Sequence, residues 1–165
     1  MSQPSWVYDC SEVQLPSGVT GLVDRCFYYC QFLTSVTLPV GVTSLGNECF
    51  YYCNALTSIT LPESIVSLGE FCFYSCESLT SITLPESVTS LGHNCFNGCT
   101  SLTLATVLPA IPPSLGLNVF NNVHTTFNIK VQSPYVDAYK TATRWSAYAD
   151  KISGISEEPV IIDSY

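Results

Sequence analysis

The 165-residue sequence predicts an α/β solenoid: a right-handed coil of about five 23-residue repeats, with a parallel β-sheet on the concave face and a C-terminal capping helix. Three observations predict this fold. Nearly identical segments recur every 23 residues, each contains one short β-branched run, and an amphipathic segment follows the last repeat. The predicted organisation is an N-terminal segment (1–9), the repeats (10–132), the capping helix (133–152) and a tail (153–165).

Three copies of the repeat agree almost residue for residue. They are LTSVTLPVGVTSLGNECFYYCNA (33–55), LTSITLPESIVSLGEFCFYSCES (56–78) and LTSITLPESVTSLGHNCFNGCTS (79–101). A first copy spans 10–32, and a degenerate fifth copy with one inserted residue continues from Leu102. Because so small a unit cannot bury its own apolar stripe, we expect the copies to stack with equivalent Leu and Phe side chains in contact.

Each copy predicts a strand, a turn and then a short helix or 3₁₀ turn. LTSVTL (33–38) is β-branched, has alternating apolar positions and is ended by Pro39. After a Gly that marks a bend, Leu45, Cys49 and Cys53 recur at the four-residue spacing typical of a helix. Five or six such coils, about 4.8 Å apart, predict a stack on the order of 25 to 30 Å long.

The two ends of the array differ. Phe127, Ile129 and Val131 predict a last strand, and Ser133-Pro134 then begins a helix that runs to about Ile152. Its predicted apolar face consists of Val136, Tyr139, Ala142, Trp145, Ala149 and Ile152. Only Trp6, Val7 and Tyr8 are available to cover the first coil, which suggests further repeats upstream.

Composition and charge exclude several classes of partner. Charged residues make up 11% of the chain and the net charge is −8, with no Lys or Arg between Arg25 and Lys130. Nucleic acid and anionic membranes are therefore poor partners. No run of about 18 apolar residues predicts membrane insertion, and the first residues show no signal-peptide pattern.

The consensus LTSITLPESVTSLGxxCFxxC closely resembles the BspA-like, treponemal-type leucine-rich repeat, whose units are roughly LTSITIPxSVTSIGxxAFxxC. The resemblance covers about Cys10 to Val123, and SPYVDAYKTATRWSAYADKI resembles the closing segment of such arrays in bacterial surface proteins. It implies a secreted or cell-surface solenoid that adheres to host proteins or neighbouring cells, without catalytic residues or a cofactor. One departure is that Cys replaces the Ala that precedes Phe in the family pattern, at Cys26, Cys49, Cys72 and Cys95.

The nine cysteines admit three interpretations. We favour buried free thiols, because every cysteine falls where the repeat needs a core side chain and the fifth copy has Val119 and Val123 in the equivalent positions. Disulfides between stacked coils are the second interpretation, since equivalent Cα atoms would lie near 5 Å apart. A metal site is the third and has little support, because no His has ligand-like spacing. We predict no metal and no cofactor.

Two surfaces are candidate binding sites. Residues exposed between the core positions of each strand form a lattice of hydroxyls: Thr34, Ser35, Thr37, Thr57, Ser58, Thr60, Thr80, Ser81 and Thr83. This lattice suits a glycan or an extended peptide, but Ser and Thr are also ordinary strand residues copied with the repeat. Tyr28, Tyr51 and Tyr74 form an aromatic column, with Tyr29 and Tyr52 beside it, which suits a protein interface or simple packing between coils.

Catalysis has little support in the sequence. GxSxG, P-loop and GxGxxG patterns are missing. His93 and His124 are predicted to be solvated, and Glu63 and Glu86 to form a solvated column rather than an acid/base pair or calcium site. We therefore predict a non-catalytic module that binds host or neighbouring-cell protein, or a glycan. The alternatives are a spacer or assembly component that associates end to end, and an intracellular scaffold with free thiols.

Overall fold

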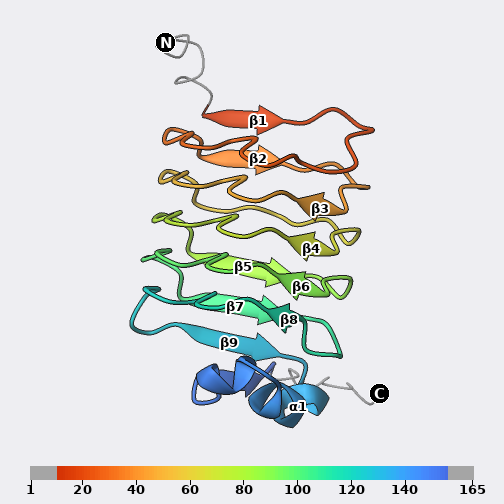
Figure 1. The fold of residues 1–165 in the computed structure, drawn as a ribbon, viewed down its shortest axis with the longest axis vertical. Helices are drawn as coiled ribbons and strands as arrows, with labels where there is room; N and C mark the ends of the chain where they lie inside the picture. Colours follow the sequence, from red (N-terminus) through yellow and green to blue (C-terminus); the bar gives the residue numbers. More distant parts are fainter. Residues whose placement is uncertain (1–10, 156–165) are drawn as a thin grey trace, which may run out of the picture.

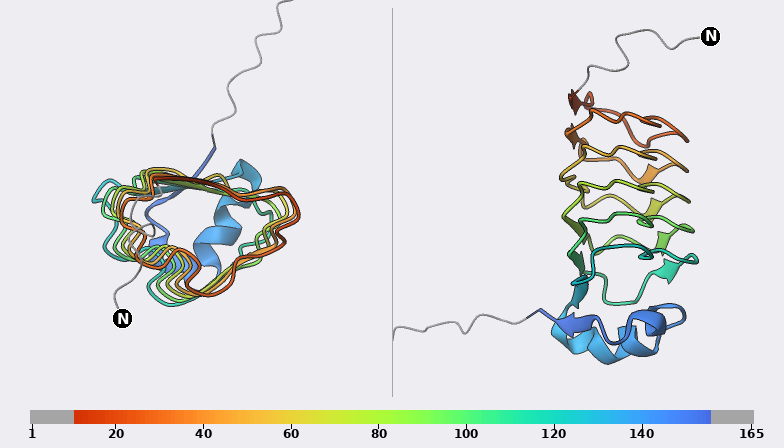
Figure 2. Two further views of the ribbon diagram at one scale, coloured as in Figure 1. Left: turned by 90° about the horizontal axis from the view of Figure 1, so that it is seen from above. Right: turned by 90° about the vertical axis from the view of Figure 1, so that its left-hand side faces the viewer.

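The computed structural model describes residues 11–155 and forms a stack of parallel coils (Figure 1). Seen from above, the coils superimpose on one closed outline, and helix α1 crosses beneath it (Figure 2). The predicted solenoid is confirmed, and the strand expected around Phe127 to Val131 forms at residues 128–131 and completes a sixth turn. The predicted N-terminal segment 1–9, with Trp6, Val7 and Tyr8, lies outside the described residues, as do Cys10 and residues 156–165 of the tail.

The first sheet forms where the sequence predicts strands, in the β-branched run of each repeat. It is in two parts: β1 (Glu12–Gln14) pairs with β2 (Ser35–Thr37), and β5 (Ser81–Leu84), β7 (Leu104–Val107), β9 (Asn128–Val131) and β10 (Ile152–Gly154) form a four-stranded part. All pairs are parallel, and equivalent residues of successive repeats face each other, as Val13 faces Val36. The third coil lies between the two parts without a regular strand; Thr60 forms a bridge with Thr37, and Thr57 N donates to Thr34 O while Thr57 O accepts from Thr80 N.

A second parallel sheet replaces part of the predicted helical segment. It consists of the two-residue strands β3 (Ser44–Leu45), β4 (Ser67–Leu68), β6 (Ser90–Leu91) and β8 (Ser114–Leu115). The following residues form successive turns closed by bonds three residues apart, such as Cys53 N to Phe50 O, so the 3₁₀-type turn that the sequence allowed is present and the short helix is not. Backbone N–H groups there alternate between the same coil and the next: Tyr51 N donates to Glu48 O, whereas Phe50 N donates to Cys72 O. The four-residue spacing of cysteines arises from these turns, which a helix cannot replace without losing the bonds between coils.

Side-chain columns fill the interior of the stack. The Phe rings of successive coils lie nearly parallel with centroids 5.1 to 5.6 Å apart, from Phe27 through Phe96 to Phe120. Leu, Ile, Val and Cys columns complete a continuous apolar core. Each coil therefore buries its apolar stripe against its neighbours, as the 23-residue period predicts.

One glycine column is required by the close approach of neighbouring coils. A Cβ atom on Gly92 would lie 2.4 Å from the backbone nitrogen of Glu70 in the coil before it, and Gly46, Gly69 and Gly116 are equally restricted. The first described coil has Val23 at this position, and its side chain is 74% exposed. A valine is accommodated there because no described coil lies over it.

The C-terminal cap contains less helix than predicted. Residues 133–155 form 3₁₀ helix η2 (Ser133–Tyr135), helix α1 (Val136–Thr141), 3₁₀ helix η3 (Trp145–Tyr148) and strand β10 (Ile152–Gly154). The single helix expected from 133 to 152 is wrong, because Ala142 is extended and Arg144 is left-handed. The end of the cap instead forms strand β10, in which Ile152 pairs with Ile129 of β9. The first sheet thus gains one more strand, and the edge of β9 is hydrogen-bonded.

The apolar face predicted for this segment nevertheless packs against the last coil. Tyr139, Trp145 and Ile152 are buried, and Val136 and Ala142 are partly buried. The Tyr139 hydroxyl donates to Pro109 O at 2.7 Å, and the Trp145 indole donates to Pro113 O at 2.7 Å. Within residues 11–155, no helix is long and apolar enough to cross a membrane.

Candidate functional site

The predicted hydroxyl lattice lies on the exposed side of the first sheet. Thr37, Thr60 and Thr83 occupy equivalent positions in successive coils and are exposed. The strand residues on either side of each threonine are buried in the core. Ser58 and Ser81 are also exposed, and Ser35 is partly buried. The alternation predicted for the strands is therefore present on this face.

Some hydroxyls of this face bind neighbouring backbone. The Thr34 hydroxyl donates to Ser11 O at 2.7 Å, and the Thr103 hydroxyl donates to Thr80 O at 3.2 Å. On the other side of the coil, Ser64 and Ser87 make the same kind of bond to the coil before them. Part of the Ser and Thr content of the repeat thus stabilises stacking.

A shallow hollow interrupts the hydroxyl lattice between the third and fourth coils. It has a volume of about 390 Å³ and includes Ser58, Thr60, Ser81, Thr83 and Glu63 in its wall. It lies where the third coil lacks regular strand pairing with β5. The hollow offers hydroxyl donors and acceptors and one carboxylate, a set that suits a polar ligand.

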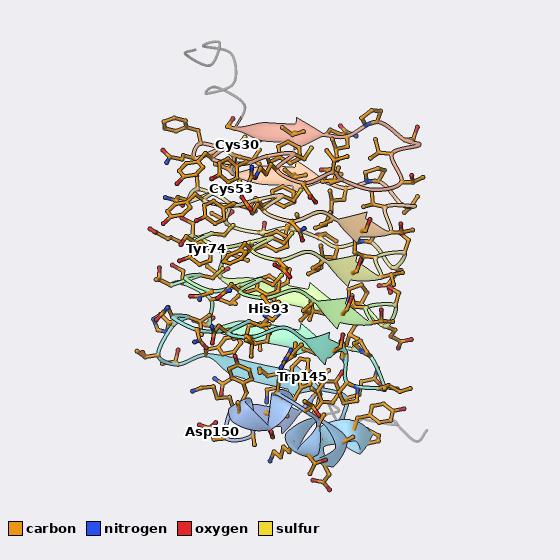
Figure 3. All side chains as sticks on the ribbon, viewed as in Figure 1. Cys30, Cys53, Tyr74, His93, Trp145 and Asp150 are labelled. Carbon is orange, nitrogen blue, oxygen red and sulfur yellow. The ribbon has the colours of Figure 1, made fainter. Side chains whose placement is uncertain are left out.

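The predicted aromatic columns form one surface on the first three coils, which we call the tyrosine patch (Tyr28, Tyr29, Tyr51, Tyr52, Phe71 and Tyr74). Within the first column, Tyr51 stacks between Tyr28 and Tyr74 at centroid distances of 5.1 and 5.0 Å. Tyr29 stacks on Tyr52 at 5.0 Å, and Phe71 lies at an angle to Tyr74. Figure 3 places Tyr74 at the side of the stack, away from the capping segment.

The tyrosine patch faces solvent with its ring edges and hydroxyls. Tyr28 and Tyr29 are 39% and 44% exposed, and Tyr51, Tyr52 and Tyr74 are partly buried. Partial desolvation raises the pKa of Tyr51, and its tyrosine neighbours add to the effect. The phenol therefore stays protonated at neutral pH and can donate a hydrogen bond to a partner.

An ion pair lies at one end of the tyrosine patch. Arg25 donates to both carboxylate oxygens of Glu48 at 2.9 and 3.0 Å, and its guanidinium lies 5.4 Å from the centre of the Tyr28 ring. The Glu48 hydrogen bond and charge raise the pKa of Arg25. The first ring of the column is thus covered by a cation that is already paired.

The repeat framework does not require these tyrosines. In the fourth coil Asn97 and Gly98 take the places of Tyr74 and Ser75, and in the fifth coil Asn121 and Asn122 do so. These coils stack regularly, helped by a bond from the Asn122 amide to Asn97 Oδ1 at 3.0 Å. Phe, Leu and Gly positions persist where the tyrosines do not, so the tyrosine patch is a property of the first three coils and not of the fold.

Backbone conformation supports this distinction. Tyr29 and Tyr52 have φ values of 60° and 57°, in the left-handed region that favours Gly and Asn. Gly98 and Asn122 occupy the equivalent positions in later coils. A tyrosine there carries a cost of about 1 kcal/mol. Bulky residues kept at an unfavourable backbone position are typical of a functional surface.

Comparison with known proteins agrees with this repeat framework. A family model described as "BspA type Leucine rich repeat region" matches six copies over residues 6–137. The chain belongs to this BspA-type leucine-rich-repeat family. No curated protein matches it. The resemblance inferred from the LTSITLPESVTSLG pattern is therefore confirmed.

Solved structures of leucine-rich-repeat proteins have the same fold. A leucine-rich-repeat protein of T. pallidum is 30% identical with a TM-score of 0.68, and the match covers 77% of this chain and 60% of that one. A leucine-rich cell surface protein of Faecalibacterium prausnitzii is 26% identical with a TM-score of 0.64, over 89% of this chain and 39% of that one. A Bacteroides capillosus repeat protein is 28% identical with a TM-score of 0.55, over 60% and 78%. The chain thus spans less than two thirds of the first two proteins.

The cysteines that distinguish this BspA-type array are mostly buried. Of the eight described cysteines six are buried, Cys30 is partly buried and Cys26 is exposed. The prediction that every cysteine occupies the core is therefore wrong for Cys26, which stands in the first described coil and is covered by the stacked column on one side only within the described residues. Cys30 and Cys53 lie one above the other in Figure 3, and the Cys53 thiol donates to Phe27 O at 3.1 Å.

Burial holds the inner thiols in the protonated form. It raises the pKa of Cys53 to about 12 and also raises the pKa of Cys76 well above its ordinary value. A thiol of that kind is a poor metal ligand and a poor nucleophile. Within the described part of the chain, no group of three or more His, Cys, Asp or Glu side chains is arranged to hold a metal ion.

Residues after the glycine column form a row of backbone caps that sequence reasoning missed. Asp24 Oδ1 accepts from Asn47 N at 2.7 Å, and Asn47 Oδ1 accepts from Glu70 N at 2.8 Å. His93, labelled in Figure 3, accepts from Leu117 N through Nδ1 at 2.9 Å. The expectation that His93 is merely solvated is wrong: it caps the next coil. A recurring acceptor residue directly after Gly was the available signal.

The remaining acidic and histidine candidates stay on the surface. His124 is exposed, and its Nδ1 lies 2.9 Å from the Thr126 hydroxyl. Glu63 lines the hollow in the hydroxyl lattice, and Glu86 accepts from the Gln132 amide at 3.3 Å. These side chains therefore make local polar contacts at the surface.

Proposed function

We propose that this chain is a non-catalytic recognition module of a secreted or cell-surface protein and that its tyrosine patch binds a protein partner. The observation that carries the proposal is the persistence of the tyrosines on three coils whose framework does not need them. Tyrosine offers a large rigid body with a polar tip and is enriched at protein interfaces. The family assignment and the cell-surface relative in F. prausnitzii support the same class of function and location.

The hydroxyl lattice is the second candidate surface, for a glycan. The hollow bounded by Ser58, Thr60, Ser81 and Thr83 supports it. Hydroxyl groups there donate and accept hydrogen bonds as sugars do. The two surfaces lie on different parts of each coil, so they can be tested separately.

The test compares three forms of the chain. One is the parent, a second replaces Tyr28, Tyr51 and Tyr74 by Asn, the residue present at Asn97, and a third replaces Thr60 and Thr83 by Lys. Each is measured against a panel of extracellular-matrix proteins and against a glycan array. Loss of protein binding at least tenfold in the Asn variant, with binding retained in the Lys variant, supports the tyrosine patch.

Loss of binding in the Lys variant, with binding retained in the Asn variant, would support the hydroxyl lattice as the binding surface instead. Binding that survives both sets of substitutions would reject both surfaces. Circular dichroism and the melting temperature of each variant serve as controls for folding, and the fourth coil predicts that the Asn variant keeps its fold.

An assembly role through end-to-end stacking is the alternative. It is disfavoured by Val23, which stands in the glycine column and is 74% exposed. The Cβ of a residue in that column would overlap the backbone of an identical preceding coil, since a Cβ added at Gly46 would lie 2.5 Å from Asp24 N. An intracellular scaffold with free thiols remains the third hypothesis, supported by the buried free cysteines.

A further inference from the structure

A second hollow lies at the junction between the fifth coil and the C-terminal cap, apart from both surfaces described above. It has a volume of about 290 Å³. Asn118 and Asn121 form one wall, and Arg144 and Tyr148 form the other. Asn118 and Asn121 repeat Asn94 and Asn97 of the fourth coil, whereas Arg144 and Tyr148 come from the cap, so the combination of these groups occurs only where the repeats meet the cap within the described residues.

Arg144 is held in this hollow by an unusual backbone. Its φ of 66° is left-handed, and it interrupts the helix expected for this segment. One guanidinium nitrogen donates to Leu115 O, which fixes the side chain against the last turn of the second sheet. A guanidinium has five N–H donors in a planar fork, so most of its donors remain for a ligand.

The other polar groups complement the guanidinium. The Asn121 amide nitrogen donates to Asn118 Oδ1 at 3.2 Å, which leaves the Asn118 nitrogen as a donor and the Asn121 oxygen as an acceptor. The Tyr148 hydroxyl accepts from Phe120 N at 3.3 Å and keeps its own proton for donation. No acidic side chain is among the residues that line the hollow.

The charge distribution also favours an anion at this end of the molecule. Within the described residues, Lys130, Lys140, Arg144 and Lys151 lie from β9 onward, against Asp137 and Asp150. The other described Lys or Arg, Arg25, is paired with Glu48 in the first coils. Among the described residues, the segment 128–155 is therefore the basic part, and like-charge repulsion of a carboxylate by these residues is smallest there.

We propose that this hollow binds a carboxylate-bearing ligand about the size of one acidic sugar or one amino acid. The Arg144 fork matches the two oxygens of a carboxylate, and the Asn118, Asn121 and Tyr148 groups match hydroxyl or amine groups beside it. A uronic acid and an acidic amino acid share this chemistry. This site is independent of the tyrosine patch and of the proposed protein partner.

The experiment is an NMR titration of the ¹⁵N-labelled full chain with sodium glucuronate, sodium glutamate and glucose. Sodium chloride at equal ionic strength is the reference for unspecific ion effects. The expected result is a saturable shift of the amides of Leu117, Asn118, Asn121 and Tyr148 with one or both carboxylates, and none with glucose. Binding of only one carboxylate identifies the source of the ligand.

Two variants and a control keep the proposal falsifiable. Arg144→Gln is expected to weaken binding roughly tenfold to a hundredfold, as the loss of a charge-assisted bond would. Since Arg144 also bonds to Leu115 O, Asn121→Ala is the second variant and is expected to weaken binding without changing the cap. Lys140→Gln removes a base outside the hollow and should bind as the parent does. Shifts equal to those with chloride, equal shifts with glucose, or equal weakening in Lys140→Gln would overturn the proposal.

Discussion

Single residues at the ends of the stack are chemically distinct from their copies in the middle. Cys26 is exposed, whereas Cys49, Cys72 and Cys95 in the same column are fully buried. The Cys49 thiol donates a hydrogen bond to the Cys26 sulfur and lowers the pKa of Cys26 to about 7. The same residue type therefore has a reactive form at the first coil and inert forms within the stack.

We predict that Cys26 reacts with iodoacetamide at a rate that rises through about pH 7. A free thiol would require about pH 8.5, because the thiolate is the reactive species and the lowered pKa makes it available earlier. Peptide mapping by mass spectrometry separates Cys26 from Cys10 and Cys30. Cys76 should remain unmodified until the chain unfolds, and a Cys26 rate that follows an ordinary thiol would refute the assignment.

The glycine column is a second feature set by single residues. We predict that Gly92→Ala destabilises the protein by about 2 kcal/mol or more, because the added Cβ would lie 2.4 Å from the Glu70 nitrogen and force the coils apart. Denaturant unfolding measures the change in free energy. Gly21→Ala is the matched control: its Cβ would meet the movable Ser44 hydroxyl at 3.1 Å, so a similar loss there would contradict the steric explanation.

Among the structural elements, the turns and the cap are held by bonds between segments distant in sequence. The cap ends the core because Tyr139 and Trp145 fill the space under the last coil and bond to Pro109 and Pro113. Trp145 lies between the coils and the capping helices in Figure 3. A few large side chains therefore provide much of the interaction that stabilises the cap against the last coil.

We predict that Trp145→Ala costs about 3 to 5 kcal/mol in the stability of the cap and exposes the last coil first. Repeat proteins transmit stability between neighbours only, so the loss should fade toward the N-terminal coils. Hydrogen exchange resolves this, with protection lost at Ile129 and Ile155 and retained at Phe50. Tyr139→Phe removes one hydroxyl bond and should cost about 1 kcal/mol. Equal loss of protection in all coils would refute the nearest-neighbour description.

For the molecule as a whole, Val23 distinguishes the first described coil from the coils that follow it. In the next four coils the column holds Gly, and a Cβ added there would overlap the backbone of the coil before it. A valine at this position opposes stacking by an identical coil, whether from an inserted repeat or from another molecule. We therefore expect this residue to oppose end-to-end stacking of identical coils.

We predict that an extra copy of residues 56–78, inserted before Cys10, stacks only when Val23 is replaced by Gly. With Val23→Gly the added coil should raise the melting temperature by several degrees, because each stacked repeat adds interface. With Val23 retained it should not. The same insertion after Ser78, where the glycine column is intact, is the positive control. Equal stabilisation with Val23 present would show that the first coil accepts a neighbour.

The 23-residue period alone was enough to predict the solenoid and its core, because a repeat with recurring Leu, Phe and Cys positions has few ways to bury them. The period also predicted the members of both candidate surfaces. Strand residues alternate between the core and solvent, and equivalent residues of identical copies lie next to each other in the stack. Features that depend on the neighbouring coil required the three-dimensional structure. The Cys49 and Cys53 spacing predicted a helix, yet N–H groups there bond to the next coil. The predicted capping helix is interrupted at Ala142 and Arg144, after which the chain returns to pair Ile152 with Ile129. Such choices rest on interactions between distant residues, which local spacing does not encode.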